Sequence, residues 1–231
     1  MRRRKPTLPV SHCHCVAIPR RLDTSKFVKL RARRGTPGRM VLRMNSEVVL
    51  VRHARSVPSK PDGPSEFQRP LTAEGNLQAH GLVRELSARI PTTVVSSPYL
   101  RAVQTVRPLA LALGLTVGVE HELREWDSGI TPHPGYAQDY AESWASPTTA
   151  RSGAESLQDL TVRAVAVLTL LADDHHDQVV VVGSHGTFVA RALVGFGVPG
   201  IDWAFCTAMP MPAIFRVRFA EDQVTVTGAG L

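Results

Sequence analysis

The chain has 231 residues, of which 43% are hydrophobic and 20% are charged, as expected for one globular α/β domain with a sizeable core. It contains no run of about 18 apolar residues, which argues against a membrane-spanning helix, and its three cysteines are too few for a disulfide framework. Residues 1–43 hold 13 of the 27 Lys and Arg residues and one acid. The formal net charge of the whole chain is +7, but that of the residues after 43 is −5. The high charge therefore gives no reason to expect a nucleic-acid partner for the domain.

Residues 1–44 form a basic leader without sustained hydrophobic periodicity. Such a segment buries too little apolar surface to offset its ordering entropy, so we predict that it is disordered. A second interpretation is that translation begins at Met40 or Met44, and a third is that the leader is a functional basic arm. Because no apolar segment of a secretory signal follows the positive start, and the cysteines suit a reducing compartment, we expect a cytoplasmic protein.

The pattern becomes regular after the leader, beginning with a strand over residues 47–52 and a Pro- and Ser-rich loop over 56–70. A helix is expected after Thr72, a natural N-cap. Its apolar stripe comprises Leu77, Leu82, Val83, Leu86 and Ile90. A short strand at 92–96 precedes a helix that is predicted to start at Ser97-Pro98 and to end at Gly114.

The second half of the chain continues the alternation of strands and helices. We expect a strand at 115–119, an elaborated loop at 127–152, a helix at 154–173, a strand at 179–183 and a helix at 187–195. Two closing strands are predicted at 211–219 and 223–227. The alternation predicts that residues 45–231 form one domain, a three-layer α/β/α sandwich with a mostly parallel central sheet.

Two of the predicted strands end at histidines. Arg52-His53 closes the first strand, and Ser184-His185 follows the apolar run that ends at Gly183. In an open α/β sheet, ligands bind beyond the carboxyl ends of the strands. An imidazole nitrogen can attack phosphorus, and a guanidinium at a strand end is costly to bury without an anion. These two strand ends predict a phosphoryl-binding pocket with a histidine nucleophile.

Other residues supply further parts of such a pocket. Arg101 lies one turn into a helix that follows a strand, near the end of a helix where anions bind. Gly183 and Gly186 beside the second histidine are expected to leave room for a close ligand. Three acids cluster after the third strand: Glu122, Glu125 and Asp127. Any one of these carboxyl groups is a candidate for the general acid.

Six segments in this order resemble the histidine phosphatase superfamily, also called phosphoglycerate mutase-like, over residues 47–219. The matching segments are Leu50-Val51-Arg52-His53-Ala54, Arg69-Pro70-Leu71-Thr72-Ala73-Glu74-Gly75 with Gln78-Ala79, Ser96-Ser97-Pro98 with Arg101-Ala102 and Gln104-Thr105, Leu123-Arg124-Glu125, Gly153-Ala154-Glu155-Ser156-Leu157, and Ser184-His185-Gly186. The resemblance implies the fold of that family, with His53 as the phosphorylated nucleophile and Glu125 as the proton donor. It implies a phosphate site formed by Arg52, Ser56, Arg101 and His185, with no metal or other cofactor.

The resemblance implies a metal-independent phosphomonoesterase that hydrolyses a small phosphorylated metabolite through a phosphohistidine. The alternatives are a mutase, which returns the phosphoryl group to a second hydroxyl, and a non-catalytic phospholigand-binding protein. The sequence departs from the family pattern at Ala54, where the signature has glycine, and at Arg55, which either adds charge at the pocket mouth or points to solvent. Residues 128–152 also lack the usual Trp-Glu-Gly continuation, and this loop is expected to shape the leaving-group site.

Overall fold

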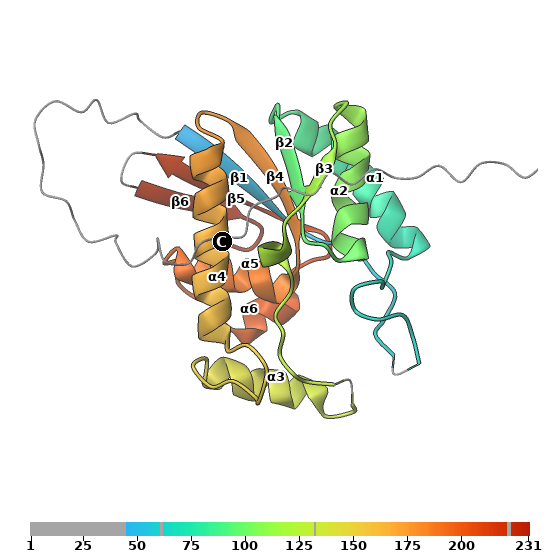
Figure 1. Cartoon of the computed structure of the whole chain (residues 1–231), viewed down its shortest axis with the longest axis vertical. Coiled ribbons are helices and arrows are strands. Elements are labelled where there is room, and N and C mark those ends of the chain that lie inside the picture. The colour runs from blue at the N-terminus through green and yellow to red at the C-terminus, as the bar shows by residue number, and fades with distance from the viewer. Residues whose placement is uncertain (1–44, 61, 132, 221–222) are drawn as a thin grey trace, which may run out of the picture.

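The computed structural model describes residues 45–60, 62–131, 133–220 and 223–231 (Figure 1). The predictions about the leader fall outside these residues. The six strands form one sheet in the order β3-β2-β4-β1-β5-β6. Their bounds are β1 Asn45–Arg52, β2 Thr93–Ser96, β3 Val117–Val119, β4 Val179–Ser184, β5 Ala213–Ala220 and β6 Gln223–Gly228. The first four strands of that order run parallel to one another. Strand β5 is antiparallel to β1, and β6 is antiparallel to β5.

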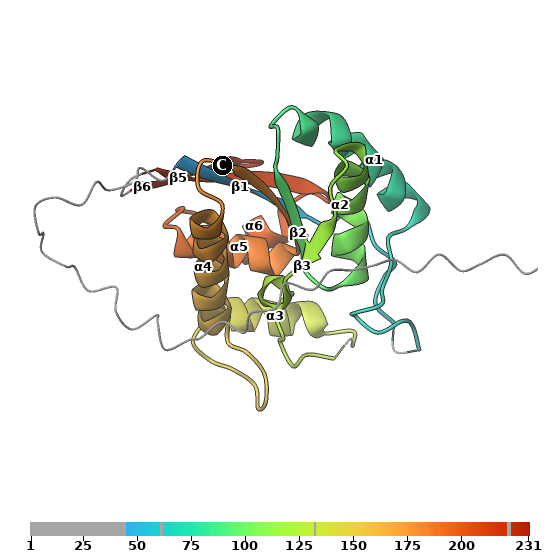
Figure 2. The same ribbon diagram turned by 45° about the horizontal axis from the view of Figure 1, so that its top comes forward.

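Helices cover both faces of the sheet, so the predicted three-layer sandwich is confirmed (Figures 1 and 2). Because successive side chains of a strand point to opposite faces, β1 contributes to two cores. Val49 and Val51 pack with α1 (Ala73–Ser87) and α2 (Leu100–Ala112). Val48 and Leu50 pack with α4 (Leu157–Asp174) and α5 (Gly186–Gly195). Among the described residues, no helix combines the length and apolar character needed to cross a membrane.

Helix α1 begins at the predicted N-cap, where the Thr72 hydroxyl accepts the Gly75 N–H at 3.0 Å, but its buried face differs from the prediction. Leu77 and Ile90 are 75% and 80% exposed, and the helix instead buries Gly75 and Ala79. The reason is a close approach between the helix and the segment after β1. A Cβ at position 75 would lie 1.9 Å from the Arg55 carbonyl oxygen, so only glycine permits this approach.

Two helices were not predicted. The expected loop at 127–152 contains α3 (Tyr136–Ala145), and α6 (Trp203–Ala208) follows α5. In α3, Tyr136, Tyr140 and Trp144 recur every four residues and form an aromatic face. The rings of Tyr140 and Trp144 lie 5.6 and 6.4 Å from that of Trp203 in α6. Within the described residues, helix α3 has no side-chain N-cap and is stabilised by this packing, whereas α6 also has a local cap, because the Asp202 side chain accepts the Phe205 N–H at 2.8 Å.

Two predicted helix starts are too early. Helix α2 begins at Leu100 rather than at Ser97-Pro98, and the Ser97 hydroxyl accepts the Tyr99 N–H at 3.2 Å. Helix α4 begins at Leu157, where Ser156 and Asp159 form a reciprocal capping box. The later start of α2 leaves Ser97 outside the helix, and its hydroxyl then contacts His185.

Candidate active site

The two predicted histidines meet at the carboxyl ends of neighbouring strands. Strands β1 and β4 pair in parallel with Arg52 opposite Ser184, and the His53 N–H donates to the Ser184 carbonyl at 2.9 Å. His185 follows directly as the N-cap of α5. The ring centroids of His53 and His185 lie 5.4 Å apart. The parallel register therefore brings together two side chains that are 132 positions apart in the sequence.

The hydrogen bonds of His53 define which ring nitrogen can act as a nucleophile. Its Nδ1 lies 2.8 Å from the Ala54 carbonyl oxygen, which only accepts hydrogen bonds, so Nδ1 carries the hydrogen. The lone pair is then on Nε2, which accepts the Arg101 Nε–H at 3.2 Å. Burial, reinforced by the charge of Arg101, lowers the pKa of His53 to about 3. His53 is therefore neutral near pH 7, with Nε2 available to attack an electrophile.

Arg101 is 2% exposed although it carries a charge. Its Nη1 donates to the Glu66 carbonyl at 2.7 Å and lies 3.3 Å from the Glu66 carboxylate. Burial, together with the nearby charge of Arg69, lowers the pKa of Arg101 to about 10, so it remains charged at neutral pH. The structure thus joins Glu66 and Arg69, which were not predicted as site residues, to the predicted pocket.

Three buried nitrogen atoms of the pocket lack a hydrogen-bond partner within the described residues. They are Nε of Arg52, Nε of Arg69 and Nδ1 of His185. Buried polar groups in proteins are normally satisfied, so exceptions require an explanation. Two of the three are guanidinium nitrogens, and the third lies on a fully buried imidazole. Their grouping beside His53 fits a site that binds an anion.

His185 is held by Ser97. The His185 Nε2 lies 2.7 Å from the Ser97 hydroxyl oxygen, which also accepts the Tyr99 N–H. The hydroxyl hydrogen is therefore free to reach Nε2, which leaves Nδ1 to carry the ring hydrogen as a donor. Burial lowers the pKa of His185 well below its usual value, and the charge of Arg101 adds to this. Ser97 was not predicted as a site residue.

The two glycines near His185 provide room for protein atoms rather than for a ligand, so that expectation was wrong. A Cβ at Gly186 would lie 3.1 Å from the guanidinium of Arg52, whose Nη1 donates to the Met209 carbonyl. A Cβ at Gly183 would lie 2.9 Å from the Val106 side chain on α2. Gly186 therefore admits the arginine, and Gly183 permits close packing of α2 on β4.

Two hydroxyl groups lie beside these residues. The Thr105 hydroxyl accepts the Ala54 N–H at 3.0 Å and donates to the Arg101 carbonyl at 2.7 Å, which joins the segment after β1 to α2. The half-buried Ser56 hydroxyl accepts Nη1 of Arg69 at 2.9 Å. The contact between Ser56 and phosphate stays a prediction. Thr105 and Arg69 lie in two of the six segments that resemble the superfamily, and this was the sequence signal from which they could have been predicted as site residues.

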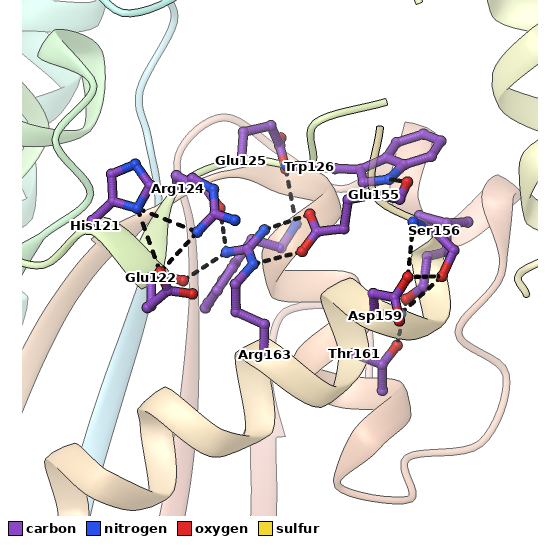
Figure 3. Close-up of polar contacts among 12 residues, drawn as sticks. His121, Glu122, Arg124, Glu125, Trp126, Glu155, Ser156, Asp159, Thr161 and Arg163 are labelled. Atoms are coloured by element: carbon purple, nitrogen blue, oxygen red, sulfur yellow. Dashed lines mark hydrogen bonds and ion pairs between the residues drawn. The ribbon is translucent and has the colours of Figure 1, made fainter. Parts of the chain in front are cut away.

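Of the three candidate acids Glu122, Glu125 and Asp127, Glu125 alone contacts the first turn of α5. Its Oε1 accepts the Phe188 N–H at 3.0 Å, and its Oε2 accepts the Thr187 N–H at 3.3 Å. Glu122 pairs with Arg124 at 3.1 Å, and Figure 3 shows its side chain directed toward His121 and Arg124. Asp127 is exposed. The structure thus places Glu125 next to the helix that His185 caps.

A largely buried ion pair between Arg163 and Glu155, whose side chains are 8% and 13% exposed, fixes the segment that carries Glu125 (Figure 3). Arg163 on α4 makes two hydrogen bonds of 2.7 Å to the Glu155 carboxylate. Its Nη1 also donates to the carbonyls of Glu122 and Arg124, at 2.6 and 3.1 Å. The Trp126 indole donates to the Glu155 carbonyl at 2.8 Å. The backbone on both sides of Glu125 is therefore tied to α4 and to the segment before it.

The two departures from the signature have different surroundings. Ala54 is fully buried and packs with Leu71 and Ala79, so its methyl group belongs to a small core cluster. Arg55 points to solvent and pairs with Glu74 at 3.3 Å, both side chains being more than half exposed. Of the two interpretations of Arg55, the structure supports the solvent-facing one.

The described residues form a three-layer α/β fold in which two histidines and two arginines meet at the carboxyl ends of β1 and β4. A model of the histidine phosphatase superfamily, branch 1, matches residues 48–229, so the chain belongs to this superfamily. A probable phosphoglycerate mutase, GpmB, of Enterobacter sp. (strain 638) is 30% identical over an alignment of 133 residues, and the match covers 53% of this chain. The aligned part spans 61% of that relative.

Solved structures share the fold. A mycobacterial glucosyl-3-phosphoglycerate phosphatase superposes with a TM-score of 0.63 at 24% identity, covering 79% of this chain and 96% of its own. A phosphoserine phosphatase from Entamoeba histolytica gives a TM-score of 0.64 at 16% identity, covering 79% and 95%. YhfR from Bacillus stearothermophilus gives 0.66 at 20% identity, covering 80% and 96%.

Proposed function

We propose that this protein is a metal-independent phosphomonoesterase that hydrolyses a small phosphorylated metabolite through a phosphohistidine intermediate. The observation that carries the proposal is the state of His53. Its Nδ1 is committed to a backbone carbonyl and its Nε2 lone pair faces the guanidinium of Arg101. A neutral, oriented imidazole beside positive charge is the arrangement that nucleophilic attack on a phosphate ester requires.

In the first step, His53 Nε2 attacks phosphorus, and the bond from phosphorus to the ester oxygen breaks. Arg52, Arg101 and the His185 Nδ1–H stabilise the charge on the equatorial oxygens. The Glu125 carboxyl group donates its proton to the departing oxygen.

In the second step, water attacks the phosphorus of the phosphohistidine and gives a proton to the Glu125 carboxylate. The bond between phosphorus and Nε2 breaks, its electron pair returns to the imidazole, and inorganic phosphate leaves. A mutase would need to retain the phosphoryl group for a second hydroxyl. We favour hydrolysis because both relatives whose names state a phosphatase activity align over at least 95% of their own length.

The test is hydrolysis of p-nitrophenyl phosphate in excess EDTA by the full chain, with alkaline quenching at early times to preserve and detect an acid-labile, base-stable phosphoenzyme. We expect turnover, a trapped phosphohistidine and inhibition by vanadate, which mimics the transition state. The variant His53→Asn is expected to lose at least about 10⁴-fold in kcat/KM and to give no trapped phosphohistidine. Loss of activity with EDTA, or substantial turnover by His53→Asn, would contradict the mechanism.

A further inference from the structure

We propose that the leaving group of the substrate is uncharged and presents a flat apolar face, which binds at the mouth of the phosphate pocket between two aromatic pairs, Phe67–Tyr99 and Tyr136–Tyr140. This inference rests on the proposed function and specifies the substrate class for the same site.

The first aromatic pair leads from the phosphate pocket to the surface. The ring of Tyr99 lies 4.9 Å from the ring of His185, and the Arg101 guanidinium lies 5.0 Å from the Tyr99 ring centroid. The Phe67 ring lies 4.7 Å from that of Tyr99, and Phe67 is 47% exposed. The Leu100 N–H donates to the Phe67 carbonyl at 2.9 Å, which fixes the backbone of the loop at this point. A ligand whose phosphate contacts His185 therefore has an aromatic surface beside its next atoms.

The second pair lies on α3, next to the segment of the general acid. The Tyr140 ring lies 5.2 Å from the ring of Trp126, the residue that follows Glu125. The Tyr136 ring lies 5.2 Å from that of Tyr140, and Tyr136 is 46% exposed. Figure 1 shows α3 and the loop segments 56–60 and 62–70 extending from the end of the domain at which β1 and β4 finish. The two pairs thus come from separate segments that flank one end of the sheet.

Two carboxylates act on both pairs. Burial raises the pKa of Tyr99, and the charges of Glu125 and Glu66 add to that rise. Burial likewise raises the pKa of Tyr140 to about 12, with contributions from the same two carboxylates. Glu66 directly precedes Phe67, and Glu125 directly precedes Trp126, whose ring lies 5.2 Å from that of Tyr140. Both phenols are neutral at physiological pH, so they offer apolar faces and hydroxyl groups rather than charge.

The charges near the mouth disfavour a second anionic group on the substrate. Of the other guanidinium groups on the neighbouring segments, Arg124 pairs with Glu122 and the solvent-facing Arg55 pairs with Glu74. Arg69 pairs with Glu66 through Nη2, and its Nε, which has no partner among the described residues, is buried in the phosphate pocket. Half of the Glu66 side chain and the Asp127 side chain face solvent. An incoming carboxylate would meet these acids without a free guanidinium to balance them, whereas an uncharged aromatic, alkyl or sugar group would meet no such penalty.

The test compares three alkyl phosphates whose alcohols need similar protonation: 2-phenylethyl phosphate, propyl phosphate and 3-phosphoglycerate. We expect kcat/KM for 2-phenylethyl phosphate to exceed that for propyl phosphate by about tenfold, the range of an aromatic contact. We expect 3-phosphoglycerate to fall at least about tenfold below propyl phosphate. A higher kcat/KM for 3-phosphoglycerate than for both neutral esters would overturn the inference.

Variants locate the effect. Phe67→Ala and Tyr136→Ala are expected to lower kcat/KM about 3- to 10-fold more for 2-phenylethyl phosphate than for propyl phosphate. Leu77→Ala is the matched control, because Leu77 is an exposed apolar residue on α1. Glu66→Gln is expected to raise the ratio of 3-phosphoglycerate to propyl phosphate turnover. Lys60 is an exposed cation on the segment between β1 and α1. If Lys60→Gln selectively abolishes turnover of 3-phosphoglycerate, this lysine binds an anionic leaving group and the inference is wrong.

Measuring ligand binding without turnover distinguishes a failure of this inference from a failure of the proposed function. Absence of p-nitrophenyl phosphate turnover by the wild-type protein would contradict the function but leaves ligand preference measurable. Calorimetric titration of His53→Asn, which cannot form the phosphoenzyme, with the same three esters then decides the preference. Tighter binding of 2-phenylethyl phosphate supports the inference, and tighter binding of 3-phosphoglycerate overturns it.

Discussion

The phosphate pocket and its mouth are built in different ways. His53 and His185 extend directly from paired core strands and are 7% and 0% exposed. Phe67 and Tyr136 lie on a loop and on α3 and are about half exposed. Altering a strand end disturbs the sheet, whereas altering the mouth changes only a few surface contacts. In the proposed mechanism, the core strands therefore carry the residues of the chemistry and the surface segments select the leaving group.

The largest effect beyond loss of His53 is expected at the general acid. Glu125→Gln should lower kcat/KM about 10²- to 10⁴-fold for propyl phosphate, because an alkoxide leaves poorly without a proton. The loss should be much smaller for p-nitrophenyl phosphate, whose phenolate leaves unprotonated. Asp127→Asn, at an exposed neighbouring acid, is the control. Equal losses with both substrates would assign the proton to another group.

A smaller effect is expected from the ion pair that holds the acid segment. Glu155→Gln should lower kcat/KM for propyl phosphate by about 10²-fold through misplacement of Glu125, with p-nitrophenyl phosphate largely spared. Arg163 and Glu155 are nearly buried, so breaking the pair should also destabilise the fold by about 3–5 kcal/mol. The double variant Arg163→Met/Glu155→Leu should recover stability in urea but not propyl phosphate turnover. Recovery of both would show that the pair acts on stability alone.

The buried imidazole of His53 should make stability depend on pH. Its folded pKa is about 3, below the value of 6.5 for an exposed histidine, so the unfolded state binds the proton first as pH falls. The contribution of neutral His53 to the free energy of unfolding is complete above about pH 6.5 and declines by up to about 1.4 kcal/mol per pH unit between pH 6.5 and pH 3. Urea unfolding of wild type and His53→Asn should show this difference in slope. Parallel curves would mean that His53 is not desolvated.

The smallest effect is expected at Arg55, the residue that departs from the signature. Arg55→Gln removes an exposed ion pair with Glu74, which is worth about 0–1 kcal/mol. We expect kcat/KM for p-nitrophenyl phosphate and for propyl phosphate to change less than about twofold. A selective loss of activity toward anionic substrates would instead place Arg55 at the mouth of the pocket.

Local patterns predicted most of the elements, because strand alternation and N-caps involve residues close together in the chain. Thr72 starts α1 as predicted, and the apolar run before Gly183 forms β4. The prediction failed where packing between distant segments dominates. Leu77 is exposed because Gly75 sets the orientation of α1, and α3 forms because its aromatic face meets Trp203.

The sequence by itself determined the sheet class, the superfamily resemblance and the two strand ends that carry His53 and His185, because these depend on short, ordered patterns. Only the tertiary structure decided which His53 nitrogen holds the lone pair and which acid contacts α5. It also placed Glu66 on the buried Arg101. Such facts depend on distances between segments that are dozens of residues apart, and these distances are defined only when the core is packed.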